Sequence, residues 1–370
     1  MGKNVLVFFG GQSTEHDISV LTGIMTLSAL RGNAAYTAHP VYVAREGSWH
    51  TGEELCDLSF YAENKKLPQK VCLLGGDNAL YGIGRNKKLK PLFKTACIVN
   101  CMHGARGEDG ALAAVAALSG IPIVGSEIAA SSAAFDKAAA KYALKGLGIR
   151  TLPFVIVDSE DDLAAAERKF GYPMFIKPAR QGSSIGVNKA ENRAEAERSL
   201  NKARKFDTKV IAEKFAAGKL EINAAAYRRK GEIVVSECEM PATENRFLTF
   251  EDKYIRGERL FPAPIDKKLS DKIRSLTAKV YAGLDCSGVV RVDFLVSGGE
   301  VYVNEVNTVP GSLAYYLFCD TFQEFSAVLD DLIAEALARF NAAQTLITRF
   351  DGNIWENAGA KGGKRFDKKR

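Results

Sequence analysis

The feature that most constrains the fold is the stretch from residue 289 to 312, VVRVDFLVSGGEVYVNEVNTVPGS. Its two halves are rich in β-branched and apolar residues, which favour extended strands. Between them, the adjacent Gly298 and Gly299 are a two-residue signal for a tight turn between antiparallel strands. The stretch therefore predicts a β-hairpin whose second strand ends at Asn307 and leads into a turn at residues 308–311.

Four polar residues of this hairpin have the spacing that places side chains on one face. Arg291 and Asp293 are two residues apart on the first strand, so both side chains point the same way. Glu305 and Asn307 repeat this spacing on the second strand. Asp293, Glu305 and Asn307 can thus converge as the oxygen ligands that Mg2+ uses beside substrate phosphates. A surface hairpin with charges on its wet face is the alternative, but the following turn offers a backbone N–H and favours the metal site.

Length and composition are those of an ordinary globular protein. The 370 residues suffice for two or three domains, and the chain is 46% hydrophobic and 25% charged. No apolar run approaches the length of a membrane span, and the one at the N-terminus is too short for a secretory signal. The seven cysteines are scattered and odd in number, which predicts buried free thiols. We expect a cytoplasmic protein that does not associate with membranes.

The net charge of +6 is concentrated at the C-terminus. Residues 361–370 hold six Lys or Arg and one Asp, net +5, which leaves about +1 for the rest of the chain. The basic character therefore belongs to the tail, and we expect no nucleic-acid-binding body. Residues 346–370 are interpreted as a basic, disordered tail.

A strand, a glycine turn and a helix open the chain. Residues 3–9 form a buried-strand pattern that ends at Gly10 and Gly11, and residues 18–30 have helical periodicity. This order opens a doubly wound α/β unit, in which ligands bind at the carboxyl ends of strands. Glu15 lies at that position, either as a site residue or as an acid that complements the helix dipole. The GxGxxG fingerprint is absent here, which disfavours NAD.

A second buried strand, residues 97–102, runs into the glycine-rich loop HGARGEDG at residues 103–110. An Ala-rich helix follows, so the loop precedes a helix N-terminus and has the form of an anion cradle. A lone histidine is more often structural than functional. The place of His103 between a strand end and this loop makes the two roles equal alternatives.

A buried lysine marks the next candidate. Residues 174–178, MFIKP, place Lys177 on a short apolar strand, and because lysine is rarely buried unpaired, we expect an anion beside it. The loop at residues 179–187 carries glycines with Ser183 and Ser184, whose hydroxyls and backbone N–H groups suit phosphate oxygens. The Walker motif GxxxxGK[ST] is absent from the chain. The strand and loop together predict a phosphate site of another type.

Acidic residues flank the next short loop. Residues 210–215 form a strand that contains Glu213, and Glu221 opens another strand after Gly218. Carboxylates in these positions can hold the amino group of an adenine and a ribose. The long polar segment at residues 244–262 has few apolar anchors and is expected to be a lid.

Together these motifs resemble the D-alanine–D-alanine ligases of the ATP-grasp superfamily, in family order over residues 4 to about 340. The matching segments are GGQSTEHDIS (10–19), MHGARGEDG (102–110), FDK (135–137), IKPARQGSSIGV (176–187), AEKF (212–215) with Glu221, DKY (252–254), and RVDF with NEVNTVPG (291–311). The resemblance implies an α/β (α+β) fold of the three-domain ATP-grasp architecture. Its parts are an N-terminal Rossmann-like domain (1–125), a central ATP-grasp subdomain (126–218) and a C-terminal catalytic subdomain (219–345). Members are commonly homodimers.

The resemblance also implies a reaction, the ATP-dependent joining of two D-alanines for peptidoglycan precursors. ATP phosphorylates the carboxylate of the first D-alanine, and the amine of the second attacks the resulting D-alanyl phosphate. Phosphate then leaves the tetrahedral intermediate, so that ADP and phosphate are the by-products.

By the same resemblance, each candidate residue has a role. Glu15 takes the ammonium of the first D-alanine, and His103 lies beside its carboxylate. Arg291 and the backbone N–H of Gly311 form the oxyanion hole. Glu15, Ser183 and Tyr254 form a hydrogen-bonded set that joins lid to cleft. The ATP-binding residues are Lys137, Lys177, Ser183, Ser184, Glu213, Lys214, Phe215, Glu221 and Lys253, and the ligands of Mg2+ or Mn2+ are Asp293, Glu305 and Asn307.

The sequence departs from the family pattern after Gly311. Most of the family has Thr/Ser-rich residues there, including a serine that grips the carboxylate of the second substrate. This chain has SLAYYLF at residues 312–318, with Tyr316 at the position of that serine and a phenol that can still donate a hydrogen bond. D-Serine or D-lactate as the second substrate therefore stays an alternative. A non-catalytic nucleotide-binding protein is the weakest alternative, because every acid, lysine and glycine that the chemistry needs is present.

Overall fold

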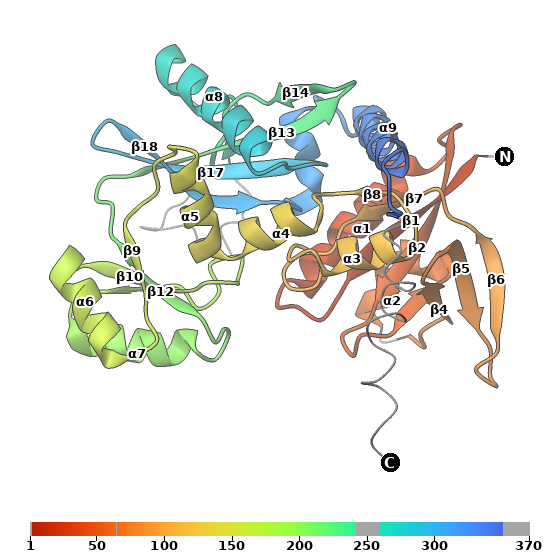
Figure 1. The fold of residues 1–370 in the computed structure, drawn as a ribbon, viewed down its shortest axis with the longest axis horizontal. Coiled ribbons are helices and arrows are strands. Elements are labelled where there is room, and N and C mark those ends of the chain that lie inside the picture. Colours follow the sequence, from red (N-terminus) through yellow and green to blue (C-terminus); the bar gives the residue numbers. More distant parts are fainter. Residues whose placement is uncertain (1, 64, 242–258, 351–370) are drawn as a thin grey trace, which may run out of the picture.

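Three main sheets build the part of the chain that the structure describes, one of eight strands and two of four, with a two-stranded pair beside the last. The computed structural model describes residues 2–63, 65–241 and 259–350. Lys253, Tyr254, most of the expected lid and residues 351–370 of the tail lie outside these ranges. Figure 1 shows the eight-stranded sheet at one side of the molecule and the two four-stranded sheets at the other.

The N-terminal sheet has the strand order β6-β5-β4-β3-β2-β1-β7-β8. β2, β1, β7 and β8 run parallel, which confirms the doubly wound opening, while β3 to β6 add an antiparallel extension. β1 is buried from Val5 onward because it is apolar and lies inside the sheet. The elements are β1 (Lys3–Gly10), α1 (His16–Leu30), β2 (Tyr36–Val43), β3 (Trp49–Thr51), η1 (Glu53–Cys56), α2 (Ser59–Ala62), β4 (Gln69–Leu74), β5 (Asp77–Ile83), β6 (Leu89–Lys94), β7 (Cys97–Asn100), α3 (Ala111–Leu118) and β8 (Ile123–Val124).

The middle sheet is wholly antiparallel, in the order β11-β10-β12-β9. Lys177 lies on β10, whose residues are all buried, as the sequence predicts. α5 begins at Lys137 because Asp136 caps it, accepting hydrogen bonds from the backbone N–H groups of Ala138 and Ala139. The elements are α4 (Ile128–Phe135), α5 (Lys137–Gly146), β9 (Phe154–Ile156), α6 (Glu160–Phe170), β10 (Met174–Pro178), β11 (Asn188–Ala190), α7 (Arg193–Ala203) and β12 (Val210–Lys214).

The third sheet, in the order β14-β13-β17-β18, contains the predicted hairpin as β17 and β18. Gly298 and Gly299 have φ of +58° and +78°, the two left-handed positions that the tightest hairpin turns require. The elements are β13 (Leu220–Arg229), β14 (Glu232–Val235), β15 (Met240–Pro241), β16 (Arg259–Leu260), α8 (Lys267–Gly283), β17 (Val290–Ser297), β18 (Glu300–Asn307), η3 (Gly311–Leu317), η4 (Phe322–Glu324) and α9 (Phe325–Gln344).

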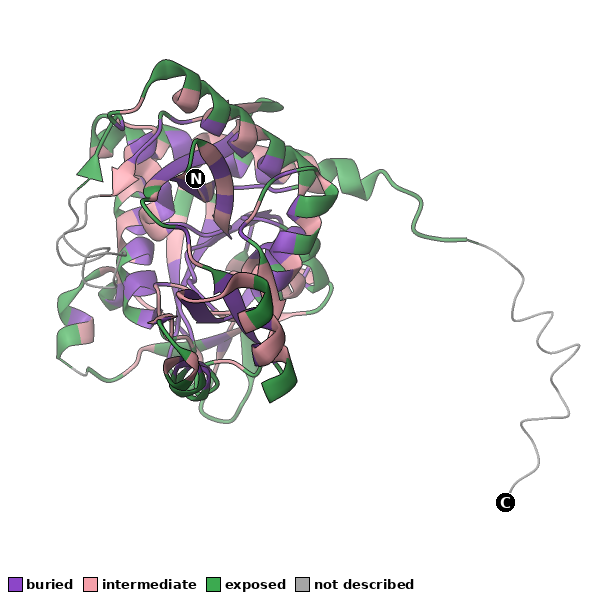
Figure 2. Ribbon diagram, turned by 90° about the vertical axis from the view of Figure 1, so that its left-hand side faces the viewer, coloured by how far each residue is buried: buried purple, intermediate pink, exposed green. Residues whose placement is uncertain are grey.

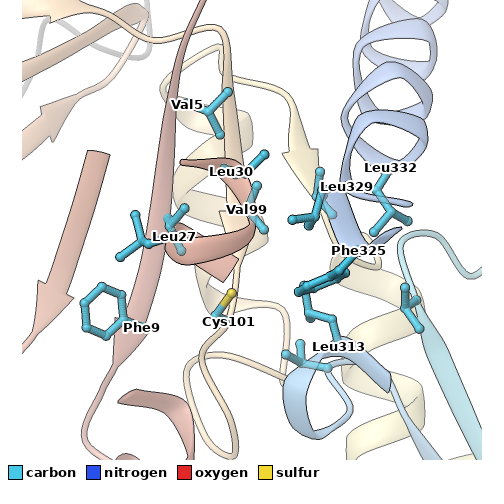
Figure 3. Close-up of a cluster of buried hydrophobic side chains, with 14 of the residues drawn as sticks. Val5, Phe9, Leu27, Leu30, Val99, Cys101, Leu313, Phe325, Leu329 and Leu332 are labelled. Carbon is cyan, nitrogen blue, oxygen red and sulfur yellow. The ribbon is translucent and has the colours of Figure 1, made fainter. Parts of the chain in front are cut away.

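The C-terminal helix α9 packs back onto the N-terminal sheet. Phe325, Leu329 and Leu332 recur at helical spacing and are at most 1% exposed. They share one apolar cluster with Val99 of β7 and Leu30 of α1 (Figure 3). Each such side chain contributes about 1.5–3 kcal/mol by leaving water. Beyond the cluster the chain leaves the body, because residues 341–350 are exposed throughout (Figure 2).

The seven cysteines are free thiols as predicted, although Cys56, Cys72 and Cys319 are only half-buried. No helix within the described ranges is long and apolar enough to cross a membrane.

A glycine junction joins the N-terminal sheet to the start of the hairpin. Ser126 donates a hydrogen bond from Oγ to the carbonyl of Ser287 at 3.0 Å, and Ser287 donates one from Oγ to the carbonyl of Gly125 at 2.8 Å. Gly288 follows with its Cα against the Gly125 backbone, where an added Cβ would lie 2.7 Å from the Gly125 Cα. Both glycines have left-handed φ, +140° and +67°. The junction therefore fixes β17 closely against the end of β8.

Candidate active site

A cavity of about 440 Å³ lies where the three sheets approach one another, and most of the predicted site residues line it. Its walls come from α1, from β10 and β12 of the middle sheet, from β13, β17 and β18, and from η3. The predicted residues on its surface are Lys137, Lys177, Ser184, Glu213, Glu221, Arg291, Asp293, Glu305, Gly311 and Tyr316.

The hairpin brings its four polar residues together as the strand spacing predicts. Arg291 donates hydrogen bonds from Nε and Nη2 to the carboxylate of Asp293, at 2.7 and 2.9 Å. Asn307 donates one from Nδ2 to Asp293 at 3.1 Å, and Glu305 lies directly opposite Asp293 in the register. Burial opposes the charge of Arg291, but the Asp293 carboxylate outweighs it and holds the pKa of the guanidinium well above its usual value.

Asp293, Glu305 and Asn307 fit a divalent cation by donor type and placement. They offer two carboxylates and an amide on neighbouring strands of one hairpin, which suits a hard cation such as Mg2+. No group of three His, Cys, Asp or Glu residues in the described part of the chain is arranged to hold a metal by itself. Because Mg2+ prefers octahedral coordination, three protein ligands would leave positions for further oxygens, such as those of substrate phosphates.

Two lysines share one buried carboxylate beside the hairpin. Lys177 donates a hydrogen bond from Nζ to Oε1 of Glu213 at 2.7 Å, and Lys141 lies 2.9 Å from Oε2. Glu213 is therefore the anion that the sequence predicts beside Lys177. Burial would raise the pKa of Glu213, but Lys141 and Lys177 outweigh it and lower this pKa to about 2. Lys141 was not predicted from the sequence, although it lies four residues after Lys137 on α5 and so shares its helix face.

Lys137 faces the hairpin from the N-terminus of α5. Its Nζ donates hydrogen bonds to the carbonyl of Gln181 at 2.6 Å and to Glu305 at 3.1 Å. Lys137 thus connects the glycine/serine loop with the candidate metal ligands. Burial opposes its charge, but Glu305 outweighs this effect, so the pKa of Lys137 is raised.

Aromatic and charged groups surround the expected adenine position at the end of β12. The rings of Phe175 and Phe215 lie 5.7 Å apart, and Nζ of Lys189 lies 4.5 Å above the Phe215 ring. Glu221 forms an ion pair with Lys219. The side chain of Lys214 is exposed, and Lys214 does not line the cavity.

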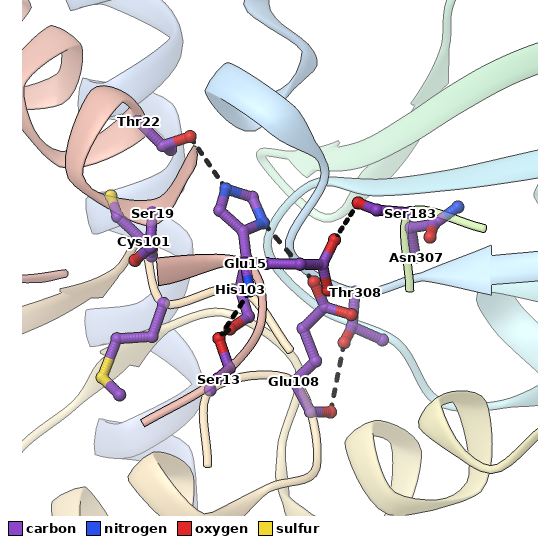
Figure 4. A network of polar contacts seen from close by, with 12 residues as sticks. Ser13, Glu15, Ser19, Thr22, Cys101, His103, Glu108, Ser183, Asn307 and Thr308 are labelled. Carbon is purple, nitrogen blue, oxygen red and sulfur yellow. Dashed lines mark hydrogen bonds and ion pairs between the residues drawn. The ribbon is translucent and has the colours of Figure 1, made fainter. Parts of the chain in front are cut away.

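The glycine/serine loop meets the N-terminus of α1 (Figure 4). Ser183 donates a hydrogen bond from Oγ to the carboxylate of Glu15, and both residues are buried. Gly182 passes so close that an added Cβ would lie 2.5 Å from Oε2 of Glu15. The predicted link between Ser183 and Glu15 is therefore present, whereas its third member, Tyr254, lies outside the described residues.

His103 is buried between two partners that the sequence reading did not identify. Its Nε2 lies 2.8 Å from Oγ1 of Thr22, and its Nδ1 lies 3.4 Å from Oε1 of Glu108 (Figure 4). Burial raises the pKa of Glu108 to about 7, and the hydrogen bond from His103 only partly offsets that. Ser312 donates its backbone N–H to the same Thr22 hydroxyl at 3.1 Å, so α1, the His103 loop and η3 meet at one oxygen.

The segment after Gly311 forms an unusual turn at the end of the cavity. Ser312, Leu313 and Ala314 have left-handed φ of 51°, 49° and 47° within η3. This turn presents Tyr316 to the cavity beside Glu239, a buried residue that the sequence reading missed. Burial raises the pKa of the Tyr316 phenol and also that of Glu239.

The chain matches known proteins over most of its length. The model of the D-Ala D-Ala ligase N-terminus matches residues 4–126, and that of the C-terminus matches residues 143–338. The D-alanine–D-alanine ligase of Thermosipho melanesiensis is 36% identical over 362 residues, covering 95% of this chain and 98% of the relative.

Solved structures of the same kind share the fold. The D-alanine–D-alanine ligase of Helicobacter pylori superposes with a TM-score of 0.74 at 29% identity, over 90% of this chain and 98% of that one. The VanG D-Ala:D-Ser ligase of Enterococcus faecalis does so with a TM-score of 0.77 at 28% identity, over 91% of this chain and 100% of that one. The fold is thus the α/β ATP-grasp fold, and the chain belongs to the D-alanine–D-alanine ligase family.

Proposed function

We propose that this protein joins two D-alanine molecules to D-alanyl-D-alanine for peptidoglycan precursor synthesis, converting ATP to ADP and phosphate through a D-alanyl phosphate. The observation that carries the proposal is that Arg291 and Asp293 of the hairpin line the same cavity as Lys137 and Lys177. Cationic groups for phosphate thereby lie beside carboxylates for a metal ion and a guanidinium for the reacting carbonyl.

The middle sheet supplies the proposed nucleotide site. Lys137 and Lys177 hold the phosphates, and the loop with Ser183 and Ser184 covers them, because ammonium groups and backbone N–H groups suit phosphate oxygens. The adenine and ribose are held by the Glu213–Phe215 segment, including Lys214, and by Glu221. The ring of Phe215 offers a flat apolar surface there. Lys253, outside the described residues, is proposed to reach phosphate as well.

The hairpin supplies the proposed metal site, made of Asp293, Glu305 and Asn307. Mg2+ or Mn2+, when bound, would neutralise charge that develops on the transferred phosphoryl group. Arg291 uses two of its donors on Asp293, and a guanidinium has five, so donors remain for an oxyanion. Together with the backbone N–H of Gly311, Arg291 stabilises the tetrahedral intermediate.

The N-terminal sheet supplies the proposed site for the first D-alanine. Glu15 accepts its ammonium group, and Ser183 holds the Glu15 carboxylate in place by the hydrogen bond described above. His103, fixed between Thr22 and Glu108, lies beside the substrate carboxylate. Tyr254, outside the described residues, is proposed to complete the set with Ser183 and Glu15.

The broader organisation of the protein belongs to the same proposal. The ranges 1–125, 126–218 and 219–345 each hold one of the three main sheets, which supports treating them as the three domains. A homodimer in the cytoplasm, acting on small molecules, fits a biosynthetic ligase of this family.

A second candidate is the joining of D-alanine to D-serine or, less directly, to D-lactate. The observation in its favour is Tyr316 at the substrate end of the cavity, together with the similarity to the VanG D-Ala:D-Ser ligase. The deciding experiment measures phosphate release with ATP and D-alanine alone, then with D-serine or D-lactate added, and identifies the products by mass. D-Alanyl-D-alanine as the main product supports the first candidate, a mixed product supports the second, and no phosphate release with any D-alanine mixture rejects both.

A further inference from the structure

The lysine and arginine side chains on the cavity wall, within the described residues, differ in how firmly they are held. Four of the five donate hydrogen bonds to a carboxylate, whereas the fifth, Arg259, does not. Nε of Arg259 lies 3.8 Å from Oε1 of Glu239, which is an ion pair beyond hydrogen-bond distance. Within the described part of the chain, no group accepts a hydrogen bond from Arg259. The other four pairs are Lys137–Glu305, Lys177–Glu213, Lys219–Glu221 and Arg291–Asp293.

Although Arg259 donates no such hydrogen bond, its position is fixed. It lies on β16, which pairs with β15 so that Arg259 is opposite Pro241. Its guanidinium carbon lies 3.9 Å from the centre of the Tyr316 ring, close enough for a cation–π contact. Its side chain is 42% exposed, while that of Glu239 is only 6% exposed. The guanidinium is thus held by its face against Tyr316, while no residue of the described ranges accepts a hydrogen bond from its edge donors.

The contacts of these cations divide the cavity into two ends. Lys177 and Lys219 both lie over the Phe175 ring, at 5.3 and 5.8 Å, and they mark the end proposed for the nucleotide. Arg259 belongs to the other end with Tyr316, whose phenol also interacts with Arg291. Arg291 is the group proposed to act on the reacting carbonyl, so Arg259 lies on the acceptor side of that carbonyl.

The acceptor in the proposed reaction brings a negative charge into this end. Its amine attacks the acyl phosphate, but its α-carboxylate takes no part and stays ionised. A carboxylate that leaves water without a cationic partner is strongly disfavoured. A guanidinium with available edge donors matches a carboxylate in shape and charge. We infer that Arg259, held on the Tyr316 ring, binds the α-carboxylate of the second substrate.

This inference rests on the proposed function and narrows its substrate class. D-Alanine, D-serine and D-lactate all carry the α-carboxylate, so Arg259 does not choose among them. It favours acceptors with a free acid next to the attacking amine or hydroxyl, and it adds nothing to the binding of a simple amine such as hydroxylamine.

The test compares Arg259→Gln and Arg259→Lys with the wild type. We expect Arg259→Gln to raise the KM for the second D-alanine roughly 10- to 100-fold, as the loss of a charged hydrogen bond would. The KM values for ATP and for the first D-alanine should change by less than about twofold, because neither contacts Arg259. Arg259→Lys keeps the charge but not the planar arrangement of donors. Its KM for the second D-alanine should therefore lie between those of wild type and Arg259→Gln.

Hydroxylamine gives a readout without an acceptor carboxylate. It attacks the acyl phosphate at the carbonyl carbon, releasing phosphate and forming D-alanyl hydroxamate. We expect Arg259→Gln to form this product at a rate within about twofold of wild type, since no carboxylate has to be bound. Arg274→Gln is the matched control, because Arg274 is similarly exposed, 37%, and pairs with Glu237 at 2.8 Å but does not line the cavity.

Each outcome bears on the inference separately from the proposed function. An unchanged KM for the second D-alanine in Arg259→Gln overturns it, and so does an equal rise in all three KM values. Loss of hydroxamate formation in Arg259→Gln also overturns it, since the defect would then precede the acceptor. A wild-type protein that forms neither dipeptide nor hydroxamate would instead reject the proposed function.

Discussion

Lys141 lies 2.9 Å from Oε2 of Glu213 while Lys177 occupies Oε1 at 2.7 Å, so a single buried carboxylate is held by two ammonium groups. The side chains of Lys141 and Glu213 are 2% and 1% exposed. Desolvation of this carboxylate is offset by the two lysines, and the folded protein therefore keeps Glu213 ionised to about pH 2.

The first prediction concerns acid unfolding of a Lys141→Met variant. The folded pKa of Glu213 is about 2 against an ordinary 4.5, so its contribution to stability is present above pH 4.5 and is lost as the pH falls towards 2. Without Lys141 this carboxyl should protonate at a higher pH, and the midpoint of acid unfolding, followed by circular dichroism, should move upward. Lys145→Met, on the exposed face of the same helix, is the control and should unfold at the wild-type pH.

The second prediction concerns Glu108, whose pKa is raised to about 7 from 4.5. Between these values the folded state holds a proton that the unfolded state releases, so this carboxyl costs stability as the pH rises from 4.5 to 7. Glu108→Gln cannot titrate. Its free energy of unfolding in urea, relative to wild type, should therefore increase over that interval. For the exposed control Glu54→Gln, we expect the free energy of unfolding to follow that of wild type at every pH. The same behaviour in Glu108→Gln would contradict the raised pKa of Glu108.

The third prediction concerns the proposed metal ligand Glu305. Glu305→Gln should reduce phosphate release by more than about 100-fold, because loss of a direct ligand should exceed the loss of an outer partner. Raising the Mg2+ concentration should recover part of the activity. Glu300→Gln is a control on the same strand, since Glu300 pairs with the exposed Arg150. Near-wild-type activity of Glu305→Gln would reject the metal assignment.

The fourth prediction separates the hydroxyl of Tyr316 from its ring. Tyr316→Phe removes one neutral hydrogen-bonding group and should raise the KM for the second amino acid by about 2- to 10-fold, and more than the KM for ATP. Tyr316→Leu also removes the surface on which Arg259 lies and should have the larger effect. Steady-state kinetics with ATP and D-alanine varied in turn would measure both. Equal changes in the two KM values would count against a substrate role for Tyr316.

The parts of the site that could be predicted depend on short sequence separations. Strand alternation places Arg291 beside Asp293, and the two glycines specify the turn that brings Glu305 opposite. The order of strand, glycine turn and helix likewise places Glu15 at the carboxyl end of β1. In each case local backbone geometry alone determines where the side chain goes.

The residues that were missed depend on how the sheets pack together. Thr22 reaches His103 and Ser312, which are 81 and 290 positions away in the chain. Arg259 lies on the two-residue strand β16, and Glu239 forms an isolated bridge with Asn223 just before β15. Elements this short have no periodicity to detect. No local pattern predicts that these residues contact one another, because their contacts form only when α1, η3 and the third sheet pack together.

The glycine junction between Gly125 and Gly288 sets the distance between the N-terminal sheet and the hairpin. A methyl group at Gly288 would lie 2.7 Å from the Gly125 backbone, so β17 would have to move away from the N-terminal sheet. Arg291 and Glu15 belong to those two parts, and they would shift relative to each other. In a screen scored by turnover alone, a substitution at Gly288 would look like damage to catalytic machinery. Neither glycine lines the cavity, so the loss would come from misalignment between two correctly built halves.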